Sequence, residues 1–117
     1  MMSKKHVNED GLRFYELREK NVERCITSFK HSLQDWPPLE WIGATAGELG
    51  EAANEIKKLV RGDFELTNSV RERIGDELAD TVIYLDLTAA SLGIDLGAAI
   101  RRKFNKTSDQ RGSSIRL

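Results

Sequence analysis

Apolar side chains recur every three or four positions along most of the chain, a spacing that is typical of amphipathic helices. The first helix is expected over about residues 9–31. The adjacent Pro37 and Pro38 end it, because a residue before proline is kept out of the helical region while proline itself suits the first turn of a helix. A second helix should therefore begin at Pro37 or Pro38 and run to about Val60, with Gly62 as its stop.

Two more helices are expected in the second half of the chain. Ser69 and Glu72 have the spacing of a capping box, which predicts a helix over residues 69–92. Asp95 should cap a fourth, shorter helix over about residues 95–105. Strand signals are nearly absent, so the pattern predicts an all-α bundle of about four helices.

The apolar positions of the second helix form one stripe that should face the core. Its members are Ile42, Ala46, Leu49, Ala53, Ile56 and Val60. The third helix is apolar nearly all round between residues 78 and 92, which predicts that it is buried nearly all round.

The 117 residues are enough for one domain that buries about two-thirds of its surface. We expect a single domain over 1–117, with its core over about 9–106 and a basic C-terminal tail over 107–117. The chain has neither a signal-peptide-like run at its start nor the roughly 20 consecutive apolar residues of a membrane span, and its single cysteine cannot form an internal disulfide. A cytoplasmic protein is the expectation.

Acidic and basic side chains nearly balance, 19 against 18, with a net charge of −1. Nothing at this level indicates a membrane or nucleic-acid partner. The C-terminal end is different, since one acid, Asp109, stands among six basic residues: Arg101, Arg102, Lys103, Lys106, Arg111 and Arg116. These could offset phosphate charge, or they could simply be solvated.

Two pairs of carboxylates stand three residues apart within predicted helices, Glu48 with Glu51 and Glu77 with Asp80. Side chains at this spacing share a helix face, with Cβ atoms roughly 5–6 Å apart. If the two helices pack face to face, four acids meet and need a positive partner. A hard divalent cation with oxygen ligands meets that need.

For Glu48 and Glu51 the alternative is a solvated helix surface, because this pair lies at the border of the apolar stripe. Glu55 is better explained as a surface residue that forms an ion pair with Lys58. The same explanation fails for Asp80, which interrupts an apolar helix where an unpaired charge would cost several kcal/mol. Asp80 is therefore the main reason to predict a metal site.

The donor set narrows the choice of metal. A di-iron bundle needs Glu-x-x-His pairs, and neither His6 nor His31 stands in one. Oxygen ligands alone favour Mg²⁺, or Mn²⁺ in its place. Because Mg²⁺ commonly shares its coordination with substrate phosphates, phosphoanhydride or phosphate-ester chemistry is indicated.

Trp36 and Trp41 flank the start of the second helix. Aromatic residues at such a junction usually serve packing. The functional alternative is a wall on which a base stacks, and Phe29 and His31 share that interpretation with less weight.

Four segments together resemble the MazG-like all-alpha nucleoside triphosphate pyrophosphatases: residues 47–53 (GELGEAA), 77–85 (ELADTVIYL), 93–96 (GIDL) and 103–106 (KFNK). The resemblance extends over roughly residues 36–111. It implies an enzyme that hydrolyses a (deoxy)nucleoside triphosphate between the α and β phosphates, giving the monophosphate and pyrophosphate and clearing unwanted nucleotides. It also implies a homodimer or homotetramer with its sites near subunit interfaces.

Carried over by position, the resemblance makes Glu48, Glu51, Glu77 and Asp80 the catalytic metal ligands, with Glu48 best placed to orient or deprotonate the attacking water. Lys103 and Lys106 would contact phosphate. The asparagine and arginine that many members carry just beyond these lysines are absent, since residues 107–109 read Thr-Ser-Asp, and Arg111 is the candidate substitute.

Two further functional classes are compatible with the sequence. One is a non-catalytic helical interaction module or an inactive nucleotide sensor. A weaker one is a nucleic-acid binder that acts through the basic tail, which would bind oligonucleotides with a steep salt dependence.

Overall fold

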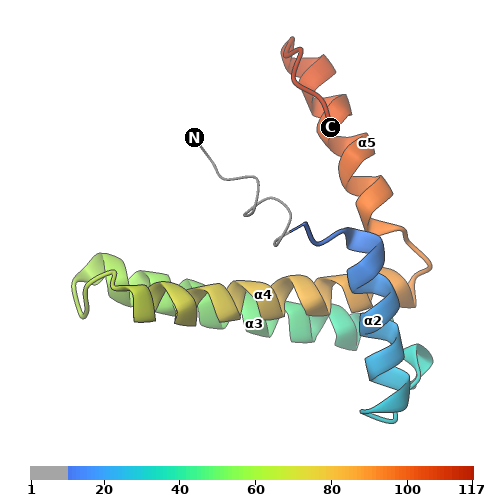
Figure 1. Cartoon of the computed structure of the whole chain (residues 1–117), viewed down its shortest axis with the longest axis horizontal. Coiled ribbons are helices and arrows are strands. Elements are labelled where there is room, and N and C mark those ends of the chain that lie inside the picture. The colour runs from blue at the N-terminus through green and yellow to red at the C-terminus, as the bar shows by residue number, and fades with distance from the viewer. Residues whose placement is uncertain (1–10) are drawn as a thin grey trace.

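A computed structural model describes residues 11–117, and the chain in this range is all-helical, as predicted (Figure 1). The elements in chain order are α2 (Phe14–Thr27), the short 3₁₀ helix η1 (Leu33–Asp35), α3 (Pro38–Arg61), α4 (Asn68–Ser91) and α5 (Leu96–Arg111). The four α-helices of this range match the expected number.

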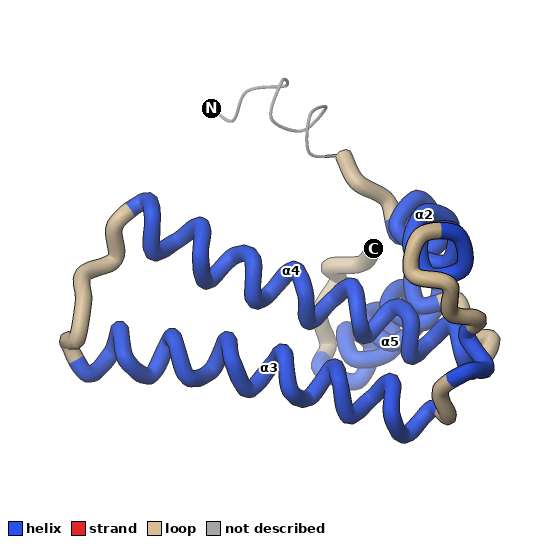
Figure 2. Tube along the Cα trace, turned by 90° about the horizontal axis from the view of Figure 1, so that it is seen from below, coloured by secondary structure: helices blue, strands red, loops and turns tan. Residues whose placement is uncertain are grey.

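The two long helices α3 and α4 lie side by side as an antiparallel hairpin, with α2 across its open end (Figures 1 and 2). Helix α5 leaves that end and projects away from the hairpin (Figure 1). It contacts α2 and α4 but not α3. No single helix of the described residues is long and apolar enough to cross a membrane, and α4 and α5 meet that test only as a pair bent by 100°.

The boundaries of α3 are confirmed. Pro37 is its N-cap, Pro38 its first residue, and Gly62 follows its end with φ +90°. Only glycine adopts that left-handed conformation at no steric cost, and its backbone N–H satisfies carbonyls of the last turn.

Three other boundaries need correction. Helix α2 covers 14–27 within the expected 9–31, of which residues 9 and 10 lie outside the described part. The N-cap of α4 is Thr67, whose hydroxyl accepts from Val70 N, and not Ser69. Helix α5 continues well past residue 105, so the predicted tail is helical as far as Arg111, with Gly112 as the C-cap.

The residues beyond α5 fold back along it. Ser108 Oγ donates to the carbonyl of Ile115 at 2.6 Å, and Leu117 N donates to Asn105 Oδ1 at 2.9 Å. The last residues are therefore tied to the helix by side-chain bonds.

The prediction about the buried face of α3 is wrong. The apolar stripe is exposed in the single chain, with Leu49 at 54 % and Val60 at 81 %. The buried residues of α3 are instead Trp41, Thr45 and Ala52. With α4 as its principal neighbour, α3 can bury one side, and that side carries a hydroxyl and acids as well as apolar groups.

Helix α4 is likewise not buried all round. Its middle has Leu78, Val82 and Leu85 exposed, whereas the segment from Asp86 to Ala89 is buried beside α2. A cluster of buried apolar side chains lies at this end, where Cys25, Trp41 and Leu87 meet, whereas Val70 and Ile74 are buried further along the hairpin.

Candidate metal centre and aromatic pocket

Three of the four predicted acids meet between α3 and α4. Carboxylate oxygens of Glu48, Glu51 and Glu77 all lie within 4.8 Å of one another. Glu48 and Glu51 come from successive turns of α3, and Glu77 comes from the facing turn of α4. The helical three-residue spacing thus brings acids from two elements together, as the sequence predicted.

The electrostatics of this cluster are unfavourable without a positive partner. Burial raises the pKa of Glu48, and the charges of Glu51 and Asp80 raise it further. Burial likewise raises the pKa of Glu77, reinforced by a hydrogen bond with the Glu51 carboxyl and by the charges of Glu51, Glu48 and Asp80. Both carboxyls therefore hold their protons more tightly than free glutamates do.

One atom of the cluster is fully shielded and unpaired. Glu77 Oε2 has no hydrogen-bond partner within the described chain. A buried carboxylate oxygen without a donor, next to two more carboxylates, suits a small hard cation. The residues present therefore fit Mg²⁺ or Mn²⁺.

Asp80 is placed differently from the expectation. It stands three residues after Glu77 on α4, near enough to raise the pKa values of Glu48 and Glu77, but it is exposed and also lines the neighbouring pocket. The prediction that Asp80 is buried among apolar groups is wrong, because this part of α4 is uncovered in the single chain.

The buried carboxylate of α4 is Asp86, at 1 % exposure, which sequence reasoning did not single out. Arg18 Nε donates to its Oδ1 at 3.0 Å and Asn21 Nδ2 donates to its Oδ2 at 3.2 Å. Arg18 also donates to the carbonyl of Ile94 at 2.7 Å. This network connects α2 to α4 and to the α4–α5 loop. Nothing in the local sequence pattern marks Arg18, Asn21 or Asp86 as partners.

Beside the acids lies a pocket of about 540 Å³ between α2, the connection from α2 to α3, and the helices α3 and α4. The predicted aromatic residues all line it: the rings of Trp36 and Trp41 have centroids 4.5 Å apart, and those of His31 and Trp36 are 6.0 Å apart. Trp41 is held in place by its Nε1, which donates to Leu33 O at 2.9 Å. Asp80 lines the same pocket, so the aromatic wall and the acid cluster adjoin.

Three further residues of this pocket were missed as site residues. Asn21 and Arg24 lie on α2, and Tyr84 lies one turn beyond Asp80 on α4. Tyr84 could have been found from its helical spacing with the acids, whereas Asn21 and Arg24 have no such signal. Arg24 places its guanidinium 5.3 Å from the centroid of Phe29, so the pocket has a cation at its edge.

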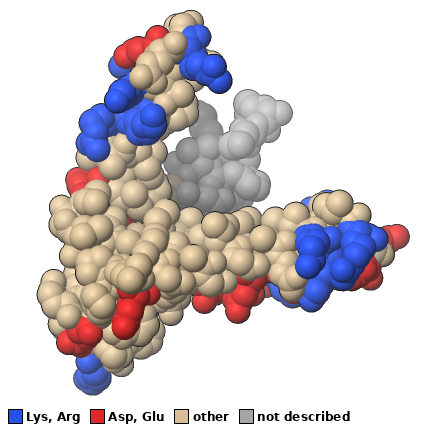
Figure 3. All heavy atoms as spheres, turned by 180° about the vertical axis from the view of Figure 1, so that it is seen from behind, with Lys and Arg blue, Asp and Glu red and all other residues tan. Residues whose placement is uncertain are grey.

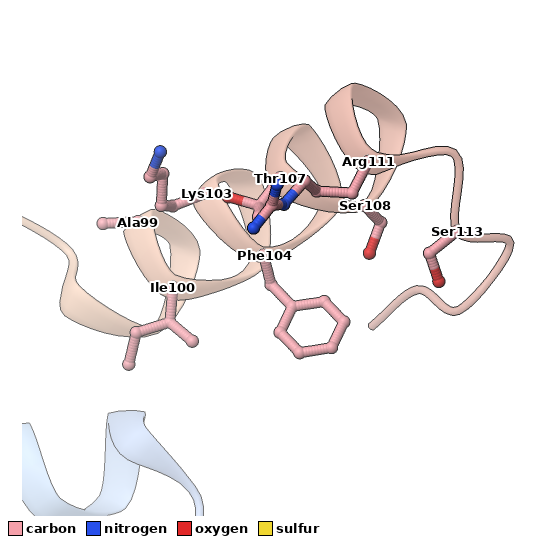
Figure 4. Close-up of a pocket in the computed structure, with 8 residues that line it drawn as sticks. All are labelled: Ala99, Ile100, Lys103, Phe104, Thr107, Ser108, Arg111 and Ser113. Carbon is pink, nitrogen blue, oxygen red and sulfur yellow. The ribbon is translucent and has the colours of Figure 1, made fainter.

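The predicted phosphate-binding residues are not near the acids within one chain. Lys103 and Arg111 line a separate open cavity of about 660 Å³ on α5, where Ile100 and Phe104 project from one side of the helix (Figure 4). Lys106 is on the same helix and is exposed. In Figure 3 basic side chains gather on α5 and at the far tip of the hairpin, with acidic side chains along the hairpin between them.

Comparison with known proteins finds a relative in a bacteriophage. The chain is 31 % identical over 70 residues to the "Gene 37 protein" of Mycobacterium phage L5. The aligned part is 59 % of this chain and 61 % of that protein, so the likeness covers under two-thirds of each. No protein-family model matches the chain, and no solved structure matches it.

Proposed function

We propose that the protein is a Mg²⁺-dependent nucleoside triphosphate pyrophosphohydrolase. The observation that carries this proposal is that the acid cluster adjoins the aromatic pocket: Asp80 lies near enough to the cluster for its charge to raise the pKa values of Glu48 and Glu77, and it also lines the pocket. A nucleotide is the ligand class that needs both, with a flat base for an aromatic wall and phosphates for a cation site. The motif resemblance supports the same reaction.

Glu48, Glu51, Glu77 and Asp80 would hold the metal, which when bound would offset phosphate charge and acidify a coordinated water. Glu48 would orient or deprotonate that water instead of binding the metal permanently. The water oxygen then forms a bond to the α phosphorus, the bond from this phosphorus to the bridging oxygen breaks, and pyrophosphate leaves with the electron pair.

Trp36, Trp41 and His31 would hold the base and exclude water around it. Arg24 lies close enough to the pocket to offset phosphate charge from the α2 side. Within one chain it is better placed for that task than the α5 lysines, because α5 does not contact α3.

We also propose that the working form is a homo-oligomer. Leu49 and Ile56 on α3 and Leu78 and Val82 on α4 are all at least 40 % exposed, which is an unusual concentration of large apolar groups for a lone chain. A second copy would cover them. It could also bring Lys103 and Arg111 of its α5 toward the acids, which is the role that the motif resemblance assigns to this end of the chain.

The deciding experiment is incubation with a panel of triphosphates and Mg²⁺ in ¹⁸O-labelled water. The expected products are pyrophosphate and a monophosphate that carries the label, because water attacks the α phosphorus. Release of orthophosphate, or no release from folded protein, would overturn the reaction.

The variant Asp80→Asn tests the site itself and should reduce turnover by about 100-fold or more while the helical fold remains. Glu55→Gln is the matched control, because Glu55 is another acid of α3 but pairs with Arg73 at 3.5 Å outside the cluster. It should leave turnover within a few-fold of the parent. Turnover of Asp80→Asn at the level of this control would remove Asp80 from the site.

Calorimetry separates the hydrolase from the non-catalytic classes. An interaction module would bind neither Mg²⁺ nor a non-hydrolysable triphosphate, and a sensor would bind both without turnover. Of these two classes, the interaction module is the one that the exposed apolar stripe favours.

A further inference from the structure

Helix α5 is held to the rest of the described chain at its first end. It follows the α4–α5 loop, contacts α2 and α4, and projects away from the hairpin (Figure 1). The residues after it bond to α5 itself, so they give it no second support. The direction of α5 is therefore decided by the contacts at its base.

Arg18 of α2 is the side chain that reaches this base. Its Nη2 donates to the carbonyl of Ile94 at 2.7 Å, and its Nε donates to Oδ1 of the buried Asp86 at 3.0 Å. Ile94 is the loop residue that precedes Asp95, the N-cap of α5, and Asp86 belongs to α4. One guanidinium group therefore connects α2 and α4 with the residue from which α5 starts.

The backbone of the loop does not fix that direction alone. Ile94 N donates to Ala89 O at 2.8 Å and Gly93 has φ +68°, so the loop is tied to α4 as far as the Ile94 amide. The next free rotation is ψ of Ile94, which sets where its carbonyl points and in which direction the chain continues. The hydrogen bond from Arg18 holds that carbonyl.

A second contact between α2 and α5 lies next to this one. Phe14 stands one turn before Arg18, so the two side chains share a face of α2. A Cβ at Gly97 would be 3.1 Å from Phe14 Cβ, so the missing side chain at Gly97 lets the first turn of α5 lie this close to α2. Helix α2 therefore supports the base of α5 at two points, one on the loop and one on the first turn.

A small change of direction at the base becomes a large displacement further along α5. Lys103 and Arg111 follow Leu96 by 7 and 15 residues, which is about 10 Å and 22 Å along the helix axis. A tilt of about 15° at the base therefore displaces these two levels by about 3 Å and 6 Å. A hydrogen bond to phosphate tolerates much less than that. The placement of both cations thus depends on how firmly the base is held.

We propose that Arg18 is a positioning residue: it fixes the direction of α5 and thereby the place at which Lys103 and Arg111 meet phosphate. The first half of the proposal concerns the fold alone, and the second half rests on the proposed function. Arg18 lines neither the aromatic pocket nor the α5 cavity, so it acts through the helix and not by contact with the ligand.

The first half is tested by pulsed electron–electron double resonance on spin-labelled protein. Cys25→Ser removes the native thiol and keeps a donor for His31 O. Gln110→Cys carries the label on α5, paired in turn with Glu40→Cys and Glu72→Cys on the hairpin, and these three side chains are exposed. An excess of unlabelled protein restricts the measured distances to one chain.

The label pair Glu40 and Glu72 supplies the width that two fixed positions of the hairpin give. In the protein with Arg18 intact, both distances to Gln110 should have a distribution as narrow as this reference. Clearly broader distributions would overturn the proposal, because α5 would then have no fixed direction even with Arg18 in place.

Arg18→Met should shift the mean of at least one distance to Gln110 by about 5 Å, or broaden it to about twice its width. Lys20→Met is the matched control, because Lys20 is a cation of the same helix whose ion pair is with Glu23 on α2, and it should change neither distance. Unchanged distances in Arg18→Met would overturn the proposal.

Arg18→Lys decides the matter where Arg18→Met fails to fold. Lysine keeps a cation beside the buried Asp86, but its single ammonium group replaces the fork whose two ends reach Asp86 and the carbonyl of Ile94. The distances to Gln110 should broaden in this variant. Distributions that match those of the protein with Arg18 intact would overturn the proposal.

The second half is tested by the kinetics of triphosphate hydrolysis. Arg18→Met should lower kcat/KM about tenfold through a higher KM, with kcat within about threefold of the parent. In a protein that already carries Lys103→Ala and Arg111→Ala, the same change should cost less than about twofold, because the cations that Arg18 positions are gone. Equal losses in both backgrounds would overturn this half. A folded protein that hydrolyses no triphosphate refutes the proposed function, and the distances then still decide the first half.

Discussion

The substitution Asp86→Asn should destabilise the protein more than any change in the acid cluster. Asp86 is the most deeply buried carboxylate of the described chain, and both of its oxygens accept hydrogen bonds, one from Arg18 and one from Asn21. Asparagine has the same shape but offers one acceptor and one donor group. One of the two incoming donors must then face an N–H₂ group at a side chain that is only 1 % exposed.

The magnitude follows from the burial of the two partners. Breaking a fully buried ion pair costs about 3–5 kcal/mol. Here Arg18 is 27 % exposed and keeps its hydrogen bond to Ile94 O. Water and that carbonyl therefore reduce the cost of leaving the Arg18 guanidinium without a carboxylate. We expect the free energy of unfolding to fall by about 2–4 kcal/mol. For a domain of this size the midpoint of thermal unfolding should fall by roughly 8–16 °C.

The assay is urea unfolding followed by far-ultraviolet circular dichroism, at one fixed protein concentration because an oligomer's stability depends on it. A double-mutant cycle with Arg18→Met isolates the pair, and the coupling energy should exceed about 1 kcal/mol. A coupling near zero, or a loss below about 0.5 kcal/mol for Asp86→Asn, would show that this network does not hold α2 on α4.

The remaining predictions concern the acids, the α5 helix and the exposed apolar stripe. Folding raises the pKa values of Glu48 and Glu77, so the native state binds more protons than the unfolded state. In the presence of a chelator, the free energy of unfolding should therefore be greatest below the ordinary carboxyl pKa. It should fall as the pH rises through the raised pKa values. Midpoints of urea unfolding measured between pH 4 and 8 check this, and a midpoint that does not change with pH would contradict it. Glu77→Gln should weaken the pH dependence of the midpoint. Mg²⁺ should restore stability at the higher pH, since it binds the ionised acids. Lys103→Ala should raise KM for a triphosphate several-fold with an unchanged circular dichroism spectrum, and unaltered kinetics would exclude Lys103 from phosphate binding. Leu49→Lys should lower the mass measured by light scattering to that of a smaller assembly, and an unchanged mass would show that this face is not an interface.

Much of the local structure followed from the sequence because it depends on neighbours in the chain. The start of α3 at Pro38 and its end at Gly62 are fixed by backbone sterics within a few residues. The placement of Glu48 and Glu51 on the same face of α3 is fixed by helix geometry. The cap of α4 was misplaced by two residues, because Thr67 and Ser69 offer the same hydroxyl and local sequence does not choose between them.

The tertiary structure alone decided which side of each helix meets another. The exposure of Leu49, the exposure of Asp80 and the burial of Asp86 all follow from where α2 and α4 lie, and that placement is set by packing between segments distant in the chain. The sequence by itself determined the helices and the acids that the hairpin brings together. The aromatic pocket beside them, with Asn21 in its wall, depends on α2 crossing the end of the hairpin, a long-range contact that no periodicity encodes.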